Sequence, residues 1–439
     1  MAVTTRNRLL VASLLVLQAA IVLVRNQHAF FGQDDFLNFG MYRDMGLSGA
    51  YLFQHVFGQI APGYRATHAV YLSVFGLHYW GCILFCVLLS VVSTGLLLSI
   101  GQRLKLESWA IAAAGIVYVS LLQPTHAQLW WSAAAHTLPS VATTLAVLWC
   151  LVGPEGGGPT KRGRLMAAAW FGVGLLFTIK VMFSLVFLVA LLVYVRRRGG
   201  APWRQVPAGV LRDLLWFAPV VCVYCVVLFV GWVPPRRPTR LGTIGKFVFV
   251  SWSDGTMAAT FGLGRSGLPF HTNGSVLFAS LVVIALILAT IRAQKRVGIL
   301  WLGFLCYVIV AMSAVAFYRS GEYGWLPGAW PRYNVENATF LVLTSMASLS
   351  GLRLRRRGVA LLLAVAAAIA LNLQVQSTRL DHGWSPENIR RYVAEFQDYH
   401  ERRRRDPTLA AKKGTVPAWV VPPWMSPHNR IEWFERLFD

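Results

Sequence analysis

The chain has 439 residues, of which 56% are hydrophobic and only 13% are charged, and its formal net charge is +23. A soluble domain carries about 25% charged residues, so this composition excludes an ordinary soluble protein and is typical of a membrane protein. The basic residues stand in short clusters between apolar runs. That is the pattern of cytoplasmic loops, so the charge indicates no nucleic-acid partner.

Apolar runs follow one another along most of the chain. A membrane-spanning helix needs about 20 mostly apolar residues, and we expect about eleven transmembrane helices. The runs are 9–24, 77–100, 108–122, 137–152, 165–178, 181–195, 211–232, 275–291, 298–317, 338–352 and 358–374. The first has a basic start but no small-residue cleavage site after it, so we expect an uncleaved span.

The clusters of lysine and arginine predict the orientation. They recur at every second junction, which places them and the N-terminus in the cytoplasm. The fifth and sixth runs are short, and they form either a hairpin or one bent helix. Two crossings over 165–195 keep the clusters before and after this segment on one side, which favours the hairpin. The longer loops, 25–76, 123–136, 233–274 and 318–337, then lie outside and predict an extracytoplasmic working surface.

We expect two regions, a transmembrane domain over 1–374 and a polar tail over 375–439. In the tail, Ser385 followed by Pro386 is typical of a helix N-terminus. We expect one helix and an irregular segment packed on the outer face. An odd number of spans puts this basic tail outside, against the simple charge rule.

Two adjacent carboxylates, Asp34 and Asp35, stand just beyond the first span. Close to a membrane the two negative charges repel each other, so the pKa of one of the two carboxyl groups is expected to rise. One carboxylate can act as general base on an incoming hydroxyl, while the other orients it or holds a divalent cation. The alternative is a solvated loop start with an Asp turn. No ligand cluster demands a metal, so metal dependence stays open.

The same outer loop continues with an amphipathic stretch, 42–59, which we expect to form a helix lying in the membrane interface. Arg65 and His68 follow before the second span. Two acids, an in-plane helix and a basic pair predict a groove for an anionic group attached to a lipid.

The second outer loop contains Trp130, Trp131 and His136. Paired tryptophans are typical of the aromatic belt at a membrane surface, and the alternative is a platform on which sugar rings stack. His136 can bond a phosphate or a hydroxyl, although a lone interfacial histidine is more often structural.

Lys180 stands between two apolar spans with no acidic residue near it in the sequence. Burial of such a cation is costly unless it reaches the interface or meets an anion, and a phosphate at the outer leaflet would be that anion. In the loop 318–337, Arg332 is placed to pair with a phosphate, with Tyr333 beside it and Glu336 as its structural counter-ion.

These features together resemble the GT-C superfamily of integral membrane glycosyltransferases. They also resemble uncharacterised bacterial members with an Asp-Asp-Trp/Phe motif, a Trp-Trp segment ahead of Leu-Pro, and a lysine on a short later hairpin. The matching residues are Asp34, Asp35 and Phe36, Trp130 and Trp131, Leu138 and Pro139, and Lys180. The resemblance covers residues 1–374. One departure is Ile179, where such relatives place a glutamate directly before the lysine.

The resemblance implies an all-α, GT-C-like membrane protein with a small extracytoplasmic C-terminal segment. It implies a hexosyl- or pentosyltransferase that moves a sugar from a polyprenyl-phosphate donor to a glycan or glycolipid acceptor of the cell envelope. Asp34 or Asp35 would be the catalytic base or the acid that orients the acceptor. The donor phosphate would be held by Arg65, Lys180 and Arg332, and the substrate by His68, Trp130, Trp131, His136, Tyr333 and Glu336.

The arginine- and alanine-rich composition indicates a high-GC bacterium, and so a plasma (inner) membrane. The main alternative is a polytopic transporter or lipid flippase, which needs polar groups near the membrane centre and often internal repeats. Here the ionisable residues concentrate at the outer ends of spans and no repeat is visible. An acyltransferase would leave the Asp pair without a role, and a structural subunit would leave Lys180 unexplained.

Overall fold

A computed structural model shows an all-α protein. It describes residues 5–56, 59–154, 156, 158–230, 239–261, 294–377 and 386–406, together with parts of 281–292 and of 408–438. Within these ranges the one sheet is a two-stranded antiparallel hairpin of β1 (His55–Val56) and β2 (Gln59–Ile60).

The protein is a multi-pass membrane protein. Six helical segments in the described part are long and apolar enough to cross a membrane, or seven with one pair bent by 52°. The six lie along α1 (Thr5–Asn26), α5 (Trp80–Arg103), α6 (Ser108–Tyr118) with α7 (Leu122–Gln128), α8 (Trp131–Leu151), α16 (Gly298–Tyr323) and α18 (Arg356–Ser377). The bent pair contains α11 (Val206–Leu214) and α12 (Ala218–Val230).

The expected number of eleven spans stays a prediction. Two of the expected spans, α9 (Lys161–Leu175) and α17 (Val335–Leu349), are helices of only 15 residues, short of the roughly 20 that cross a bilayer. α10 (Lys180–Arg198) has 19 residues with basic residues at both ends. The run 275–291 lies largely outside the described residues.

The helical hairpin predicted over 165–195 is confirmed. α9 and α10 are separate helices joined by residues 176–179, and Arg164 at the start of α9 and Arg196 at the end of α10 both pair with Asp213. α10 packs closely on α16, where a Cβ added at Gly303 would overlap Ala190. It also packs on α17, where the rings of Phe187 and Phe340 stack 4.3 Å apart. Small residues and stacked rings bring membrane helices together where no hydrophobic effect drives them.

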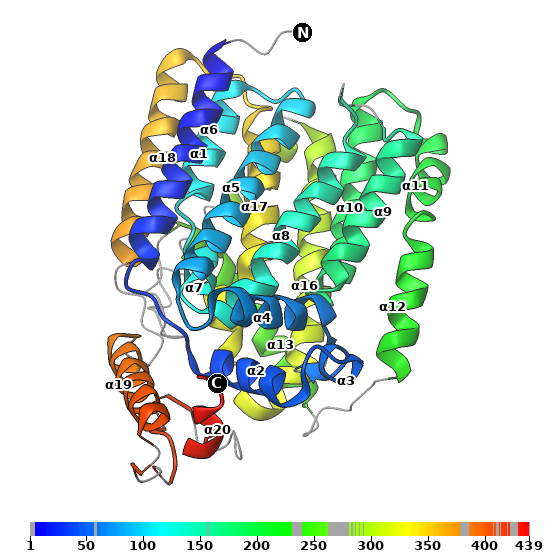
Figure 1. The fold of residues 1–439 in the computed structure, drawn as a ribbon. Helices are drawn as coiled ribbons and strands as arrows, with labels where there is room; N and C mark the ends of the chain where they lie inside the picture. The colour runs from blue at the N-terminus through cyan, green and yellow to red at the C-terminus, as the bar shows by residue number, and fades with distance from the viewer. Residues whose placement is uncertain are drawn as a thin grey trace.

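The basic junctions between helices meet at one end of the bundle. Arg198, at the end of α10, donates to the main-chain oxygen of Lys105 at 3.2 Å. The amide of Glu107 donates to Ser350 Oγ, beyond the end of α17, at 2.9 Å. The opposite end carries the short helices of the first outer segment and the tail helices (Figure 1). The basic junctions therefore gather at the end of the bundle opposite the first outer segment and the tail.

The first outer segment contains four short elements besides β1. They are α2 (Gln33–Met45), α3 (Gly49–Leu52), β2 and α4 (Pro62–Phe75). The prediction of a single interfacial helix over 42–59 is wrong. α2 ends at Gly46, whose φ of 62° is the left-handed value that favours glycine at a helix end. Ser48 then begins a new helix by accepting from the amide of Tyr51 at 3.2 Å.

The tail packs against α2. Its helices are α19 (Pro386–Arg405), which begins where the sequence predicted, and α20 (Ile431–Glu435). Phe434 lies 5.4 Å from Phe36 between ring centroids, and Trp433 Nε1 donates to Asp44 at 2.7 Å. The tail thereby covers the face of α2 that carries Phe36, Gly40 and Asp44. Ser385 lies outside the described residues.

Candidate functional site

The acidic pair lies in the first turn of α2, where the helix dipole favours negative charge. Asp35 is fully buried. Its carboxylate accepts from the amide of Gly32 at 2.6 Å, from the amide of Ser132 at 2.6 Å and from Ser132 Oγ. It therefore joins the start of α2 to the start of α8, which is a structural task.

Burial raises the pKa of Asp35 to about 7. The hydrogen bonds from Ser132 and Gly32 oppose this rise, and the neighbouring charge of Asp34 adds to it. A carboxyl group in this setting changes its charge near neutral pH.

Asp34 is the acid left free to react. It is half-buried, and in the part of the chain that the structure describes no hydrogen bond or ion pair engages its carboxylate. Burial raises its pKa, and the charges of Arg319 and Arg332 oppose the rise. Asp34 and Asp35 therefore have different roles in the structure, although the sequence gives no reason to distinguish them.

Three cations surround the ring of Tyr333, which lies in η5 (Pro331–Asn334). Arg332 Cζ lies 5.5 Å, Lys180 Nζ 5.6 Å and Arg319 Cζ 5.9 Å from the centroid of that ring. The pKa of Tyr333 is lowered: burial alone raises it, but the charges of the three cations outweigh burial. The site therefore has a positive potential that suits an anion such as a phosphate.

Lys180 has an acidic partner that the sequence could not reveal. Its Nζ donates to the main-chain oxygen of Tyr333 at 2.9 Å and lies 3.4 Å from Glu336 Oε2. Ser140 Oγ donates to Glu336 Oε1 at 3.0 Å. Glu336 is therefore the counter-ion of Lys180, and the expectation that it serves Arg332 is wrong.

Arg332 is held by aromatic rings instead of by an acid. Its Cζ lies 4.3 Å from the ring centroid of Trp130 and 4.5 Å from that of Trp330. Burial lowers its pKa, while Tyr333 and Asp34 oppose that change. Stacking leaves the N–H edge of a guanidinium available to a ligand. Trp130 thus has a partner in the site, namely the guanidinium of Arg332.

Trp131 is not available as a sugar platform. Its side chain is 1% exposed and packs 4.7 Å from the ring of Tyr71 and 5.1 Å from that of Phe85. These rings belong to α4 and α5, so Trp131 is a core residue that fixes α8 between them. Only the first of the two adjacent tryptophans contacts the cationic group.

Arg65 and His68 lie inside the fold. Arg65 is 3% exposed and donates to Asn38 Oδ1 at 2.7 Å, so it fixes α4 on α2 and is not one of the cations around Tyr333. His68 is fully buried, and burial lowers its pKa to about 3. Its Nε2 lies 3.3 Å from Ser132 Oγ. The groove that these two residues were expected to line is filled by their own packing.

His136 does belong to the cationic region. It is half-buried on α8, and its Nδ1 lies 2.9 Å from Thr137 Oγ1. The charges of Lys180, Arg319 and Arg332 act on its ring. The structure thus brings His136, Lys180, Arg332, Tyr333 and Glu336 together, and the charge of Arg332 acts on Asp34.

Two residues of the site, Arg319 and Asn334, were not predicted from the sequence. Arg319, near the end of α16, differs in no visible way from other basic residues beside a span. Asn334 is buried and donates to the oxygens of Gly328 at 2.9 Å and Trp330 at 3.0 Å. It also accepts from Thr256 Oγ1 at 3.3 Å in η2 (Ser251–Ala258), a π-helix. Short π-helical segments are frequent at functional sites.

A metal site does not follow from the residues that are described. Among them no three His, Cys, Asp or Glu side chains are grouped to hold an ion. Asp35 already accepts hydrogen bonds on both oxygens, which leaves Asp34 alone. A divalent cation at this pair stays a prediction.

No protein-family model and no characterised protein matches the sequence. The fold is similar to a crystal structure of ArnT from Cupriavidus metallidurans bound to undecaprenyl phosphate, with 17% identity over 98% of this chain and 86% of that one, and a TM-score of 0.46. The crystal structure of the same protein in the apo state has 17% identity over 86% of this chain and 76% of that one, with a TM-score of 0.45.

Proposed function

We propose that the chain is a GT-C-like membrane glycosyltransferase. It moves a sugar from a polyprenyl-phosphate donor to a hydroxyl of a cell-envelope glycan or glycolipid, at the extracytoplasmic face of a bacterial plasma membrane. The observation that carries the proposal is the Asp34 carboxylate, which has no hydrogen bond among the described residues and on which the charges of Arg319 and Arg332 act. An unbonded base beside a group of cations suits a hydroxyl acceptor and a phosphate leaving group.

In the proposed reaction the acceptor oxygen attacks the anomeric carbon of the sugar. The bond from that carbon to the phosphate oxygen breaks, and polyprenyl phosphate leaves with the electron pair. Asp34 takes the proton of the acceptor hydroxyl, and its raised pKa makes it a stronger base than an exposed carboxylate.

The cations stabilise the charge that develops on the leaving phosphate. Arg332 is stacked against Trp130 and Trp330, so its guanidinium is oriented before the donor arrives. Lys180 is paired with Glu336, so Arg332 supplies the main charge for the phosphate. Positioning of the two substrates supplies the rest of the rate enhancement.

The position of the site supports the extracytoplasmic face. α2 and the starts of α10 and α17 lie at the end of the bundle opposite the basic junctions (Figure 1). Basic junctions are typical of the cytoplasmic side. A transporter would instead need its ionisable groups near the membrane centre.

A binding experiment tests the phosphate site. The full chain is purified in a neutral detergent, and its thermal unfolding is followed with undecaprenyl phosphate and with undecaprenol, which lacks the phosphate. We expect undecaprenyl phosphate to stabilise the wild type and Asp34→Asn by about 2.7 kcal/mol at 100 times its Kd, and undecaprenol to have little effect. Arg332→Gln should lose the response, and the matched control Arg391→Gln, an exposed arginine of α19, should keep it.

A turnover experiment tests the base. Release of undecaprenyl phosphate is measured from a panel of undecaprenyl-phosphate hexoses and pentoses with a bacterial envelope extract as acceptor. Asp34→Asn should slow release by roughly 10²- to 10⁴-fold, the usual contribution of a general base, without loss of donor binding. Equal stabilisation by undecaprenol, or full turnover by Asp34→Asn, would overturn the proposal.

A further inference from the structure

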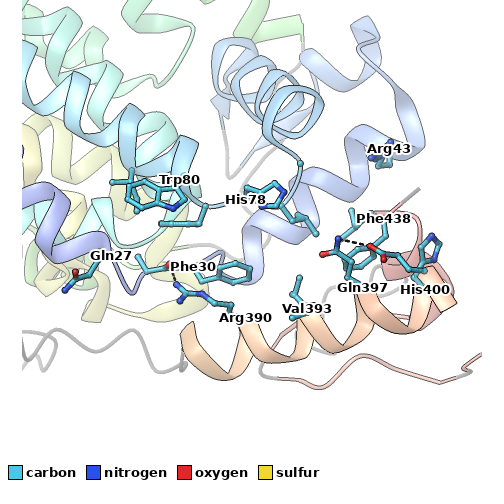
Figure 2. Close-up of a pocket in the computed structure, with 18 of the residues that line it drawn as sticks. Gln27, Phe30, Arg43, His78, Trp80, Arg390, Val393, Gln397, His400 and Phe438 are labelled. Carbon is cyan, nitrogen blue, oxygen red and sulfur yellow. Dashed lines mark hydrogen bonds between the residues drawn. The ribbon is translucent and has the colours of Figure 1, made fainter. Parts of the chain in front are cut away.

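A cavity of about 600 Å³ lies between the tail and the first two spans (Figure 2). α19 forms one wall, with Arg390 and Val393, and the segments at the end of α1 and the start of α5 form the other, with Phe30 and Trp80. Asp34 and the residues around Tyr333 are not part of its lining. Its size is within the range of small-molecule sites.

Positive charge dominates the lining. The cavity is lined by Arg43 of α2 and by Arg390 and Arg404 of α19. Arg43 and Arg404 are exposed, and neither has a hydrogen bond or ion pair in the part of the chain that the structure describes. Glu401, an acid of the same lining, lies 3.9 Å from Arg405. The arginines of the cavity are therefore left without a carboxylate partner among the described residues.

Arg390, the third arginine of the lining, packs against Phe30. Its Nη2 donates to the main-chain oxygen of Ala29 at 2.9 Å, and its Cζ lies 5.5 Å from the ring centroid of Phe30. Figure 2 shows Arg390 beside Phe30 and below Trp80. The guanidinium of Arg390 is thus fixed against an apolar ring at the cavity wall, where a phosphate in the cavity can reach it.

The apolar side of the cavity continues onto a membrane span. Trp80, the first residue of α5, lines the cavity and is 66% exposed. Leu84 and Leu88 follow at intervals of four residues and are 57% and 61% exposed. Residues spaced by four share one face of a helix, so an exposed apolar stripe extends about 12 Å from the cavity along the span.

We propose that this cavity binds the phosphate-bearing head group of an anionic glycerophospholipid, with an acyl chain lying along the exposed stripe of α5. The arginines match the phosphate, and the apolar stripe matches the chain. A zwitterionic lipid brings its own ammonium group to a cavity that is already positive, so it fits less well. The site is distinct from the phosphate site around Tyr333 and stands whether or not the chain transfers a sugar.

The test uses the full chain, purified and freed of lipid in a neutral detergent. Thermal unfolding is titrated with phosphatidylglycerol, with phosphatidylcholine and with inorganic phosphate. The cavity variant is Arg43→Gln/Arg404→Gln, whose two side chains make no described bond, so folding should be unaffected. The matched control is Arg391→Gln/Arg402→Gln, which removes the same charge from exposed positions of α19 outside the cavity.

We expect phosphatidylglycerol to stabilise the wild type and the control equally, and its apparent Kd to be roughly thirtyfold weaker for the cavity variant, since two cations near the surface are lost. Arg332→Gln should bind phosphatidylglycerol like the wild type, which separates this site from the proposed donor site. An equal response to phosphatidylcholine, a full response to inorganic phosphate alone, or equal weakening in the control would each overturn the proposal.

Discussion

The ammonium of Lys180 lies 3.4 Å from the carboxylate of Glu336, a residue 156 positions away, and both side chains are buried. The pair joins the first residue of α10 to the first turn of α17. Because Ser140 of α8 donates to the other carboxylate oxygen, one glutamate connects three helices around the candidate site.

Loss of one partner of this pair should be strongly destabilising. Glu336→Gln leaves the buried Lys180 without its counter-ion, and we expect a loss of about 3–5 kcal/mol in the free energy of unfolding. The double variant Lys180→Met/Glu336→Gln should recover most of that loss, because no unpaired charge remains. Denaturant titration in detergent measures both. A double variant as unstable as the sum of the single variants would contradict the prediction.

Asp35 should make the stability of the protein depend on pH. Its pKa is raised from 3.8 to about 7 in the folded state, mainly by burial, so the folded protein binds this proton more tightly than the unfolded chain. The resulting stabilisation is complete below about pH 4 and is lost as the pH rises through about 7.

We therefore expect the wild type to lose stability between pH 5 and pH 8, on the order of a few kcal/mol. Asp35→Asn should be less stable overall, because it disturbs the bonds to Gly32 and Ser132, and should show a smaller change over this range. Thermal unfolding at the two pH values measures the difference. Asp34→Asn should keep most of the dependence, and identical pH profiles for wild type and Asp35→Asn would contradict the assignment.

The positions of the helices were predictable because a membrane leaves few alternatives. A chain in lipid must bond its backbone internally, so long apolar runs become helices, and α1, α5, α8, α16 and α18 follow such runs. The hairpin of α9 and α10 followed from the charges on either side of it. Both predictions depend only on residues that are close together in the sequence, so they need no knowledge of contacts between distant segments.

The roles of the site residues depend on contacts between distant segments. Asp34 and Asp35 are adjacent and identical in type. Asp35 is the structural acid because it accepts from Gly32 and from Ser132, and Ser132 is 97 positions beyond it in the sequence. Arg65 and His68 look like groove residues, but α4 turns them towards α2 and α8. The single helix expected over 42–59 failed for a local reason, since Gly46 and Ser48 end one helix and begin another.

Gly40 is expected to be sensitive to the smallest substitution. A Cβ at this position would overlap the indole of Trp433, which itself bonds to Asp44. Gly40→Ala should therefore push α20 away from α2 and lower the free energy of unfolding by about 1–3 kcal/mol, as overpacking does. Limited proteolysis should cut the tail faster. Gly49→Ala is the matched control, because a Cβ there meets no atom within 4 Å, and equal effects of the two substitutions would contradict the proposed contact.

Asn334 should act as a positioning residue for the cations. Its side chain bonds the main chain of the loop before η5 and the π-helix η2 at once, and Arg332 and Tyr333 precede it directly. Asn334→Ala removes several buried hydrogen bonds, each worth about 1 kcal/mol or more, and frees the loop that holds Arg332 between its two tryptophans.

We expect the Kd for undecaprenyl phosphate to weaken about tenfold in Asn334→Ala, which corresponds to about 1.4 kcal/mol, even at temperatures where the variant is fully folded. Asn372→Ala, an exposed asparagine on α18, should leave the Kd unchanged. Binding is measured well below the unfolding temperature of each variant, so a lower stability alone cannot produce the effect. If Asn334→Ala is less stable but binds the lipid as the wild type does, the loop keeps Arg332 in place by its aromatic contacts alone, and Asn334 serves the fold only.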